Sequence, residues 1–407
     1  MSPSSATTLA VLFSLLLLHP LSAADSDSPA TPSAARTPKA YPPGVRSLEV
    51  FRDADRLHLL LGSFSSDSAP PLLTHQSSTD WGKTWSEPVQ VNVPGVLNPH
   101  GLHRGVDARI AASGSLIVAA WSGAGSDKWG SGPIVTVLSQ DAGKTWRPGP
   151  NPADDGRTDG HNFLALGTDS LGKFHLAWLD SRDGERGLRY SVSRDGGGSW
   201  ASNSTAAPKT CECCWNALAP LDQGGIAILY RARTPRDMHV VTSPNGGAQW
   251  NQPVPVGNFQ WDLNVCPHVG GALATCPGPQ GQRLHATVWT GAAGKSGLYH
   301  LRSDDAGQSW SSPHKMNVPM AWHPHLAADR FGRVAAVWDT MTASTPVVWG
   351  CLSTDAGNTW SPPRALSPEG VPAGFPRVVS TEEGFRVFWT SEQPNQAATW
   401  TSVPFVP

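Results

Sequence analysis

The sequence lacks a charge excess and, past its N-terminus, a long apolar run, and each absence excludes a class of protein. The formal net charge is −2 over 407 residues, so nothing attracts the chain to nucleic acid or to an anionic membrane. No later stretch approaches the roughly 18 apolar residues that a membrane-spanning helix needs. We therefore expect a mature chain with no nucleic-acid partner and no membrane insertion.

The N-terminus resembles an export signal, although no Lys or Arg precedes its apolar run. Leu9 to Leu18 is too short an apolar run to cross a bilayer, and the small residues at 22–24 suit a cleavage site. We predict a signal peptide over residues 1–24, a linker rich in Ser, Pro and Ala over 25–44, and a single domain over 45–407. The expected location is secreted or periplasmic.

Helix-favouring stretches are scarce, since the chain holds 41 Gly and 37 Pro, whereas one octapeptide recurs six times. Its pattern is Ser-x-Asp-x-Gly-x-(Thr/Ser)-Trp, and the copies begin at residues 78, 139, 193, 243, 303 and 353. In the fourth copy, Asn245 replaces Asp and Gln249 replaces Thr or Ser. Short Ser and Asp side chains accept bonds from nearby amides, Gly supplies a positive φ, and Trp anchors the turn.

This octapeptide resembles the Asp box (BNR repeat) of sialidase-like β-propellers. A strand–turn–strand unit precedes each box and usually ends in an aromatic residue, and a seventh unit without a box ends at Trp389. We predict an all-β fold, a sialidase-like β-propeller of four-stranded antiparallel blades. The count favours seven blades, with six as the alternative, and a segment near 38–45 is expected to supply the missing outer strand of the last blade.

In such a propeller, the segments that lead into the innermost strands converge on one face, opposite the Asp boxes. Aligning the repeats places an unusual set of polar residues in these segments: Asp107, Arg109, His161, Cys211, Cys213, Cys214, Cys266, His268, His323, His325 and Arg377. The loop after Tyr230 faces the same side, and it adds Arg231, Arg233, Arg236 and Asp237. We expect a funnel of Cys, His and Arg side chains.

The crowded thiols of "CECC" at 211–214 admit three interpretations. Six cysteines on an exported chain suggest disulfides, and Cys276 is expected to pair with Cys351. Thiolates beside imidazoles suit copper or zinc, and the candidate ligands are Cys211, Cys213, Cys214, Cys266, His268, His323 and His325. A reactive redox thiol is the third interpretation, and with no metal bound no cofactor is expected.

The arginines suggest a further site on the same face. Arg231, Arg236 and Arg377, together with His161 and Asp237, are candidates for binding an anionic or polar ligand. Asp107, Arg109 and Arg233 are the candidate catalytic residues if the chain is a glycosidase of sialidase type that acts on an acidic sugar. Such an enzyme needs a Tyr–Glu nucleophile, and none of the four tyrosines lies in the last hundred residues.

The chain also resembles bacterial exported proteins labelled sialidase-like, which share the Cys-x-Cys-Cys segment, a "YR…RD" loop and a "W…CP" segment. That label implies a fold and no defined substrate. We expect a monomer that binds a small molecule, a glycan or a metal ion in its funnel and is not a true sialidase. The alternatives are a sialidase-type glycoside hydrolase and a non-catalytic interaction propeller with every cysteine in a disulfide.

Overall fold

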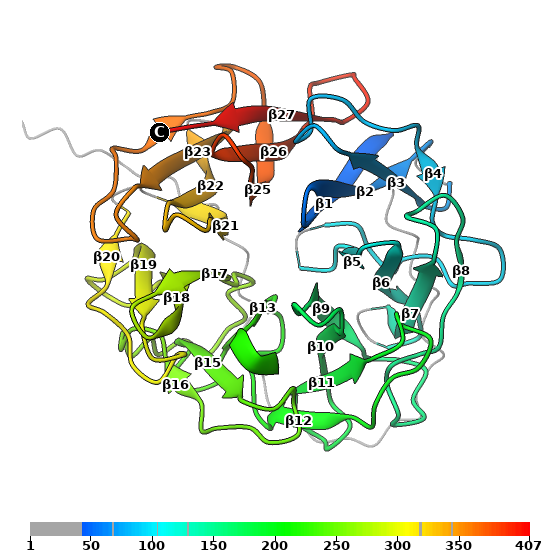
Figure 1. The fold of residues 1–407 in the computed structure, drawn as a ribbon, viewed down its shortest axis with the longest axis horizontal. Helices are drawn as coiled ribbons and strands as arrows, with labels where there is room; N and C mark the ends of the chain where they lie inside the picture. Colours follow the sequence, from blue (N-terminus) through cyan, green and yellow to red (C-terminus); the bar gives the residue numbers. More distant parts are fainter. Residues whose placement is uncertain (1–42, 67–68, 104, 128–129, 317–319, 343–344) are drawn as a thin grey trace, which may run out of the picture. The chain divides into compact units, whose positions relative to one another are not determined.

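The computed structural model describes residues 43–407 except 67–68, 104, 128–129, 317–319 and 343–344. The predicted signal peptide and nearly all of the predicted linker lie outside the described residues. In the described part, seven sheets stand in a ring (Figure 1), and the centre of the ring, onto which the innermost strands face, is here called the channel. No helix there is long and apolar enough to cross a membrane. The seven-bladed all-β propeller is therefore confirmed.

Each blade is a meander whose consecutive strands pair antiparallel, from the channel outward. The innermost strands are β1 (Gly44–Asp53), β5 (Arg109–Ser113), β9 (Asn162–Thr168), β13 (Ala217–Pro220), β17 (Ala272–Gly278), β21 (Ala321–Ala328) and β25 (Ala373–Ser380). The second strands are β2 (Arg56–Phe64), β6 (Leu116–Ala124), β10 (Phe174–Asp180), β14 (Ile226–Arg231), β18 (Gly281–Thr290), β22 (Val334–Thr342) and β26 (Phe385–Ser391).

The third and fourth strands complete the blades toward the rim. The third strands are β3 (Leu72–Ser78), β7 (Ser131–Ser139), β11 (Gly187–Ser193), β15 (Met238–Ser243), β19 (Gly297–Ser303), β23 (Thr345–Ser353) and β27 (Thr399–Phe405). The outer strands are β4 (Val89–Gln90), β8 (Arg147–Pro148), β12 (Ser204–Ala207), β16 (Val254–Pro255), β20 (His314–Lys315) and β24 (Arg364–Ala365). A 3₁₀ turn, η1 (Asp222–Gly224), joins β13 to β14.

The seventh blade has three strands among the described residues. Of the segment expected to complete it, residues 38–42 lie outside the described part, whereas Gly44 and Val45 belong to β1 of the first blade. Gly44 forms a parallel bridge to Ala398, which directly precedes β27, and the Val45 amide donates to the Ala398 carbonyl at 2.8 Å. The two ends of the described chain therefore meet where the ring closes.

The Asp boxes form the turns between the third and fourth strands, as predicted. In the first box, the Gly82 amide donates to Ser78 Oγ at 2.8 Å, and the Thr84 amide and hydroxyl donate to the Asp80 carboxylate at 2.9 and 2.6 Å. The same pattern recurs in the other boxes, and Asn245 Oδ1 replaces the carboxylate in the fourth. Each box therefore satisfies its own backbone amides.

Large aromatic side chains fill the core between blades. Trp121, Trp178, Trp338 and Trp389, at equivalent positions in their second strands, are each at most 1% exposed. The Trp residues that close the boxes are half-buried and pack against the blade cores. Burying indole rings at a fixed place in each repeat explains most of the chain's 18 Trp residues structurally.

Candidate functional site

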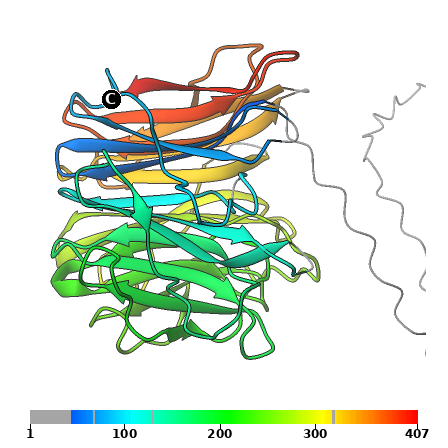
Figure 2. The same ribbon diagram turned by 90° about the vertical axis from the view of Figure 1, so that its right-hand side faces the viewer.

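One face of the ring carries the predicted funnel residues. Within a blade the strands alternate in direction between the two faces, which Figure 2 shows edge-on. The segments that lead into the inner strands and the loops between second and third strands therefore share one face, here called the funnel face. The Asp boxes lie on the opposite face, here called the box face.

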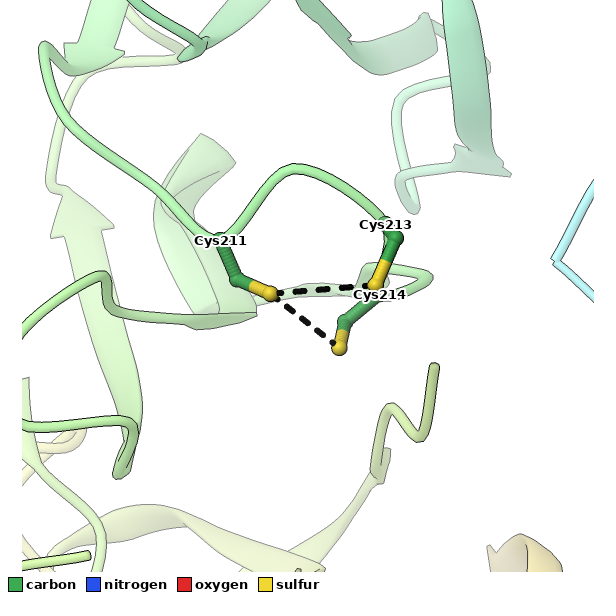
Figure 3. Close-up of side chains that lie close together, drawn as sticks. All are labelled: Cys211, Cys213 and Cys214. Atoms are coloured by element: carbon green, nitrogen blue, oxygen red, sulfur yellow. Dashed lines mark hydrogen bonds between the residues drawn. The ribbon is translucent and has the colours of Figure 1, made fainter. Parts of the chain in front are cut away.

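Three cysteines gather in the segment between β12 and β13 on the funnel face. Cys211 Sγ lies 3.5 Å from Cys214 Sγ and 4.0 Å from Cys213 Sγ, and Figure 3 shows the Cys211 sulfur facing both of the others. All three sulfurs lie within 4.8 Å of one another, a spacing that could hold a metal ion. Cys211 and Cys214 are each 1% exposed.

A disulfide joins Cys213 to Cys266, which lies in the segment leading into the next blade. It ties two neighbouring funnel segments together and leaves Cys211 and Cys214 as the free thiols of the cluster. The predicted disulfide between Cys276 and Cys351 is wrong, because both thiols are free. Cys276 Sγ lies 3.3 Å from His285 Nε2 within its own blade, and Cys351 Sγ lies 3.9 Å from the sulfur of Met316.

Arg231, the last residue of β14, and Arg236, in the loop that follows, lie beside the free thiols. Arg236 donates to Cys211 Sγ at 3.0 Å. The hydrogen bond from Cys214 lowers the pKa of the Cys211 thiol most, and Arg236 and Arg231 lower it further. Burial raises the pKa of Cys214. Near neutral pH the pair therefore consists of one thiolate, Cys211, and one thiol, Cys214.

The remaining charged residues of that loop have separate surroundings. The Asp237 carboxylate accepts bonds from the amides of residues 259–261, at 2.7 to 3.1 Å, and is 2% exposed. Arg233 lies 4.0 Å from Glu212, and its side chain is 45% exposed. Both residues thus have local partners.

The predicted catalytic pair Asp107 and Arg109 lies in the channel, within a buried ionic network. Arg109 donates to Glu49 at 2.7 Å, and Arg377 donates to the same Glu49 oxygen at 2.7 and 2.9 Å. Arg377 also lies 3.3 Å from Asp107 Oδ2. Burial alone would raise the pKa of Glu49, yet Arg377 and Arg109 outweigh it and lower that pKa, whereas burial raises the pKa of Asp107.

The predicted histidines do not gather around the thiols as one set. His161 is fully buried, with Nε2 3.2 Å from the Asp155 carboxylate. His325 is half-buried near Glu49 in the channel network, accepts the Val378 amide at 3.2 Å, and has its pKa lowered by desolvation to about 4. The His268 ring lies 6.1 Å, centroid to centroid, from those of His103 and Phe163.

Three inner strands share a β-bulge where they leave the funnel face. In each, two inner-strand residues oppose one buried Trp of the second strand, Trp178, Trp338 or Trp389. The first bulged residues are Phe163, His323 and Phe375, with φ of 58°, 44° and 57°. Bulges and positive φ values at non-glycine residues concentrate beside functional sites because they redirect side chains.

Asp339 joins the bulges of the sixth and seventh blades. Its carboxylate lies 2.9 Å from His323 Nδ1 and accepts the Phe375 amide at 2.8 Å. The two rings are held 4.5 Å apart between centroids. Asp339 is 5% exposed, so its charge is satisfied by these two bonds rather than by water.

A cavity of 410 Å³ opens beside this pair, between the sixth, seventh and first blades. Trp322, His323 and Phe375 form its aromatic wall, and Arg46, Asp339 and Glu392 supply charged groups. Phe375 is 36% exposed, and Arg46 pairs with Glu392. Sequence reasoning singled out His323 but missed Trp322, Phe375 and Asp339. The repeated pair of an aromatic residue followed directly by Pro, in "HPH" and "FPR", is the signal that could have found two of the three bulges.

A second cavity, of 380 Å³, lies over the cysteine segment. Cys266, Arg233 and Arg236 line it, together with Glu212 and Asp262. The disulfide is therefore reachable from this cavity, whereas the two free thiols are buried behind it.

Comparison with known proteins gives the same fold. A family model described as a BNR repeat-like domain matches residues 49–254. No curated protein sequence matches the chain. Among solved structures, an ulvan lyase from a new family of polysaccharide lyases is similar at 10% identity, with 89% of this chain and 93% of that one covered and a TM-score of 0.59.

Two further structures illustrate the range of similar propellers. An α-L-arabinofuranosidase from Fusarium graminearum, solved with an iminosugar inhibitor, matches at 14% identity over 76% of this chain and 92% of that one, with a TM-score of 0.51. A Trypanosoma rangeli sialidase matches at 10% identity over 89% and 55%, with a TM-score of 0.49. At these identities the likeness is one of fold.

Proposed function

The chain belongs to the family of BNR repeat-like domains, and from that premise we propose that it is an exported carbohydrate-binding propeller. Its ligand is a neutral oligosaccharide that binds in the cavity between the sixth, seventh and first blades. The observation that carries this proposal is the aromatic wall of Trp322, His323 and Phe375 beside three charged groups.

The lining matches what a sugar ring needs from a protein. The C–H face of a sugar packs on aromatic rings, and its hydroxyls bond to carboxylate, guanidinium and hydroxyl groups that fix its orientation. Here Trp322 and Phe375 supply the rings, and Asp339, Glu392 and Arg46 supply the polar groups. The bulges hold the rings in place before any ligand arrives, which lowers the entropic cost of binding.

Charge favours a neutral sugar over an acidic one. Two carboxylates and one guanidinium line the cavity, and Arg46 is already paired with Glu392. The carboxylate of an acidic sugar would meet this net negative lining without an uncommitted guanidinium to neutralise it. The similar structures are named as a polysaccharide lyase and an arabinofuranosidase, which supports carbohydrate as the ligand class.

The positions of the predicted catalytic residues argue against sialidase chemistry. Asp107 and Arg109 are bonded within the channel network, and Arg233 lies near Glu212 in another part of the funnel face. A sialidase needs its arginines around one carboxylate of the substrate. Hydrolysis of a fluorogenic sialoside, lost on Arg233→Ala, would overturn this part of the proposal.

Calorimetric titration with neutral tetrasaccharides of glucose and of arabinose, alongside 3′-sialyllactose, tests the binding site. We expect binding of a neutral sugar that weakens at least about tenfold, about 1.4 kcal/mol, in Trp322→Ala and Phe375→Ala. The matched control is Phe331→Ala, an aromatic that is 63% exposed in the β21–β22 turn of the same sixth blade, on the box face. Tighter binding of the sialoside, or equal losses in all three variants, would refute the proposal.

We also propose that the chain is exported with removal of residues 1–24. The short apolar run and the small residues that follow it support this proposal. Mass spectrometry of the protein recovered from medium or periplasm should give a chain that starts at Asp25. A chain retained in the cytoplasm at full length would contradict it.

A further inference from the structure

The buried charge around the cysteine segment is unusual. The Arg231 guanidinium is 1% exposed, and it donates only to backbone carbonyls, those of Val269, Arg236 and Trp289. Arg236 donates to the Leu263 carbonyl and to Cys211 Sγ. In the described part of the chain, neither arginine forms an ion pair with a carboxylate.

A buried guanidinium without a counter-charge is costly, so the neighbouring sulfurs are the natural place for negative charge. Arg236 places its guanidinium 3.0 Å from Cys211 Sγ, and the Cys211 amide donates to the Arg231 carbonyl at 2.8 Å, so both arginines lie beside the cluster. Asp237, the buried carboxylate of the same loop, is bonded to backbone amides instead. The surroundings of the cluster therefore stabilise thiolates.

The sulfur positions suit a metal ion. Three thiolates at about 2.3 Å from a central ion lie about 4 Å from one another. The Sγ separations from Cys211 are 3.5 and 4.0 Å, and the third is below 4.8 Å. Small rotations about the Cys side chains would bring all three sulfurs around one ion.

We propose that Cys211, Cys213 and Cys214 form a three-thiolate site for a soft monovalent ion, copper(I), which the Cys213–Cys266 disulfide closes when it is oxidised. Three thiolates and two guanidinium groups leave one negative charge, which a monovalent ion neutralises. A divalent ion such as zinc would leave an uncompensated positive charge in a buried site. Soft thiolate ligands favour copper(I) independently of this charge count.

Opening the site is a two-electron reduction. An external dithiol transfers two electrons and two protons to the Cys213–Cys266 disulfide, which yields two thiols, and the dithiol itself becomes a disulfide. Cys266 lines the 380 Å³ cavity and is exposed, so a reductant can reach the disulfide from there. Copper binding then displaces the protons that remain on the three thiols of the cluster.

This site shares no residue with the proposed carbohydrate cavity, so each proposal can fail alone. Copper(I) affinity is measured by competition with bicinchoninate under anaerobic conditions, on disulfide-intact protein and on protein reduced with dithiothreitol that is then removed. We expect one copper(I) per reduced chain, bound at least about a hundredfold more tightly than by the disulfide-intact protein. X-ray absorption should show three sulfur neighbours.

Single variants separate this site from adventitious thiol binding. Cys266→Ser frees Cys213 and should bind copper(I) like the reduced protein without any reductant. Cys211→Ser and Cys214→Ser should lose the tight site, whereas Cys276→Ala, a buried cysteine toward the box face, should keep it. Equal affinity in the oxidised and reduced proteins, retention by Cys211→Ser, or preference for zinc over copper(I) would each overturn the proposal. If Cys266→Ser does not fold, the comparison of oxidised with reduced wild-type protein decides.

Discussion

Gly247, in the fourth Asp box, has a φ of +89° and lies against the Tyr190 ring of the preceding blade. A Cβ added at this position would lie 2.0 Å from a Tyr190 ring atom. The glycine therefore serves two purposes, because it supplies the left-handed backbone of the turn and lets one blade approach the next.

We predict that Gly247→Ala is more destabilising than a left-handed backbone alone would explain. The conformation costs about 1–2 kcal/mol, and the contact with Tyr190 adds about 1–3 kcal/mol of overpacking. Gly95→Ala is the matched control, since Gly95 also has a φ of +89° but nothing within 4 Å of its added Cβ. Urea unfolding should show the larger loss for Gly247→Ala, and equal losses would refute the steric argument.

The residues of the site show how far sequence reasoning reached. Repeat alignment placed Cys211 and Arg236 on one face, and they are in contact, because blade topology fixes which loops share a face. It did not find the role of Phe375, because an exposed aromatic at a bulge looks in sequence like any strand residue. It left the pairing of Cys213 with Cys266 open, because connectivity depends on distances that spacing alone does not give.

At the scale of the strand, two hairpins carry buried histidine pairs. His58 on β2 and His75 on β3 lie with ring nitrogens 3.0 Å apart, and His285 on β18 and His300 on β19 lie 3.1 Å apart. Burial lowers the pKa of His58 and of His285 to about 3, and that of His75 to about 4. All four are neutral in the folded protein near pH 7.

These pairs make stability depend on pH. An unfolded chain protonates its histidines near pH 6.5, whereas in the folded chain His58, His75 and His285 protonate only near pH 3–4. Over that interval the unfolded state binds more protons, so stability is greatest above pH 6.5 and falls as the pH is lowered. Melting temperatures between pH 7.5 and 5, above most carboxyl titrations, should show this fall.

Removing one pair should flatten the pH profile. The double variant His58→Gln, His75→Gln should lose less stability than the wild type between pH 7.5 and 5. His314→Gln, an exposed histidine on β20, should leave the profile unchanged. If the melting temperature of the double variant falls with pH as steeply as that of the wild type, the histidine pair does not cause the pH dependence.

At the scale of the whole molecule, Glu49 links three blades across the closure of the ring. It pairs with Arg109 of the second blade and Arg377 of the seventh, while it belongs to the first. Replacing it by Gln leaves two buried guanidinium groups without their partner, which we expect to cost about 3–5 kcal/mol of unfolding free energy.

An exposed ion pair between the same two end blades is the control for this prediction. Lys83 and Glu383 lie 3.2 Å apart with side chains 56% and 66% exposed, so Glu383→Gln should cost less than about 1 kcal/mol. Chemical denaturation of both variants measures the difference. If the two variants lose similar amounts of unfolding free energy, burial of the ion pairs does not determine how much they stabilise the closed ring.

The fold itself could be predicted because the strand–turn–strand unit recurs seven times in the sequence. The octapeptide dictates one turn of each blade but the last, and the buried Trp residues dictate the second strand. The ring closure was harder to predict from the sequence, because the Gly44–Ala398 bridge joins residues that lie far apart in the chain and belong to no repeated motif. The carbohydrate cavity was the hardest feature to predict, since it forms where three blades meet.

The central claim is that the cavity between the sixth, seventh and first blades binds carbohydrate. A crystal structure of the protein soaked with a neutral tetrasaccharide tests this claim most directly. The account predicts electron density for a sugar ring packed on Trp322 and Phe375, with hydroxyls bonded to Asp339 or Glu392. Density for the sugar only over the channel or on the box face would contradict it, as would an unliganded cavity at saturating sugar.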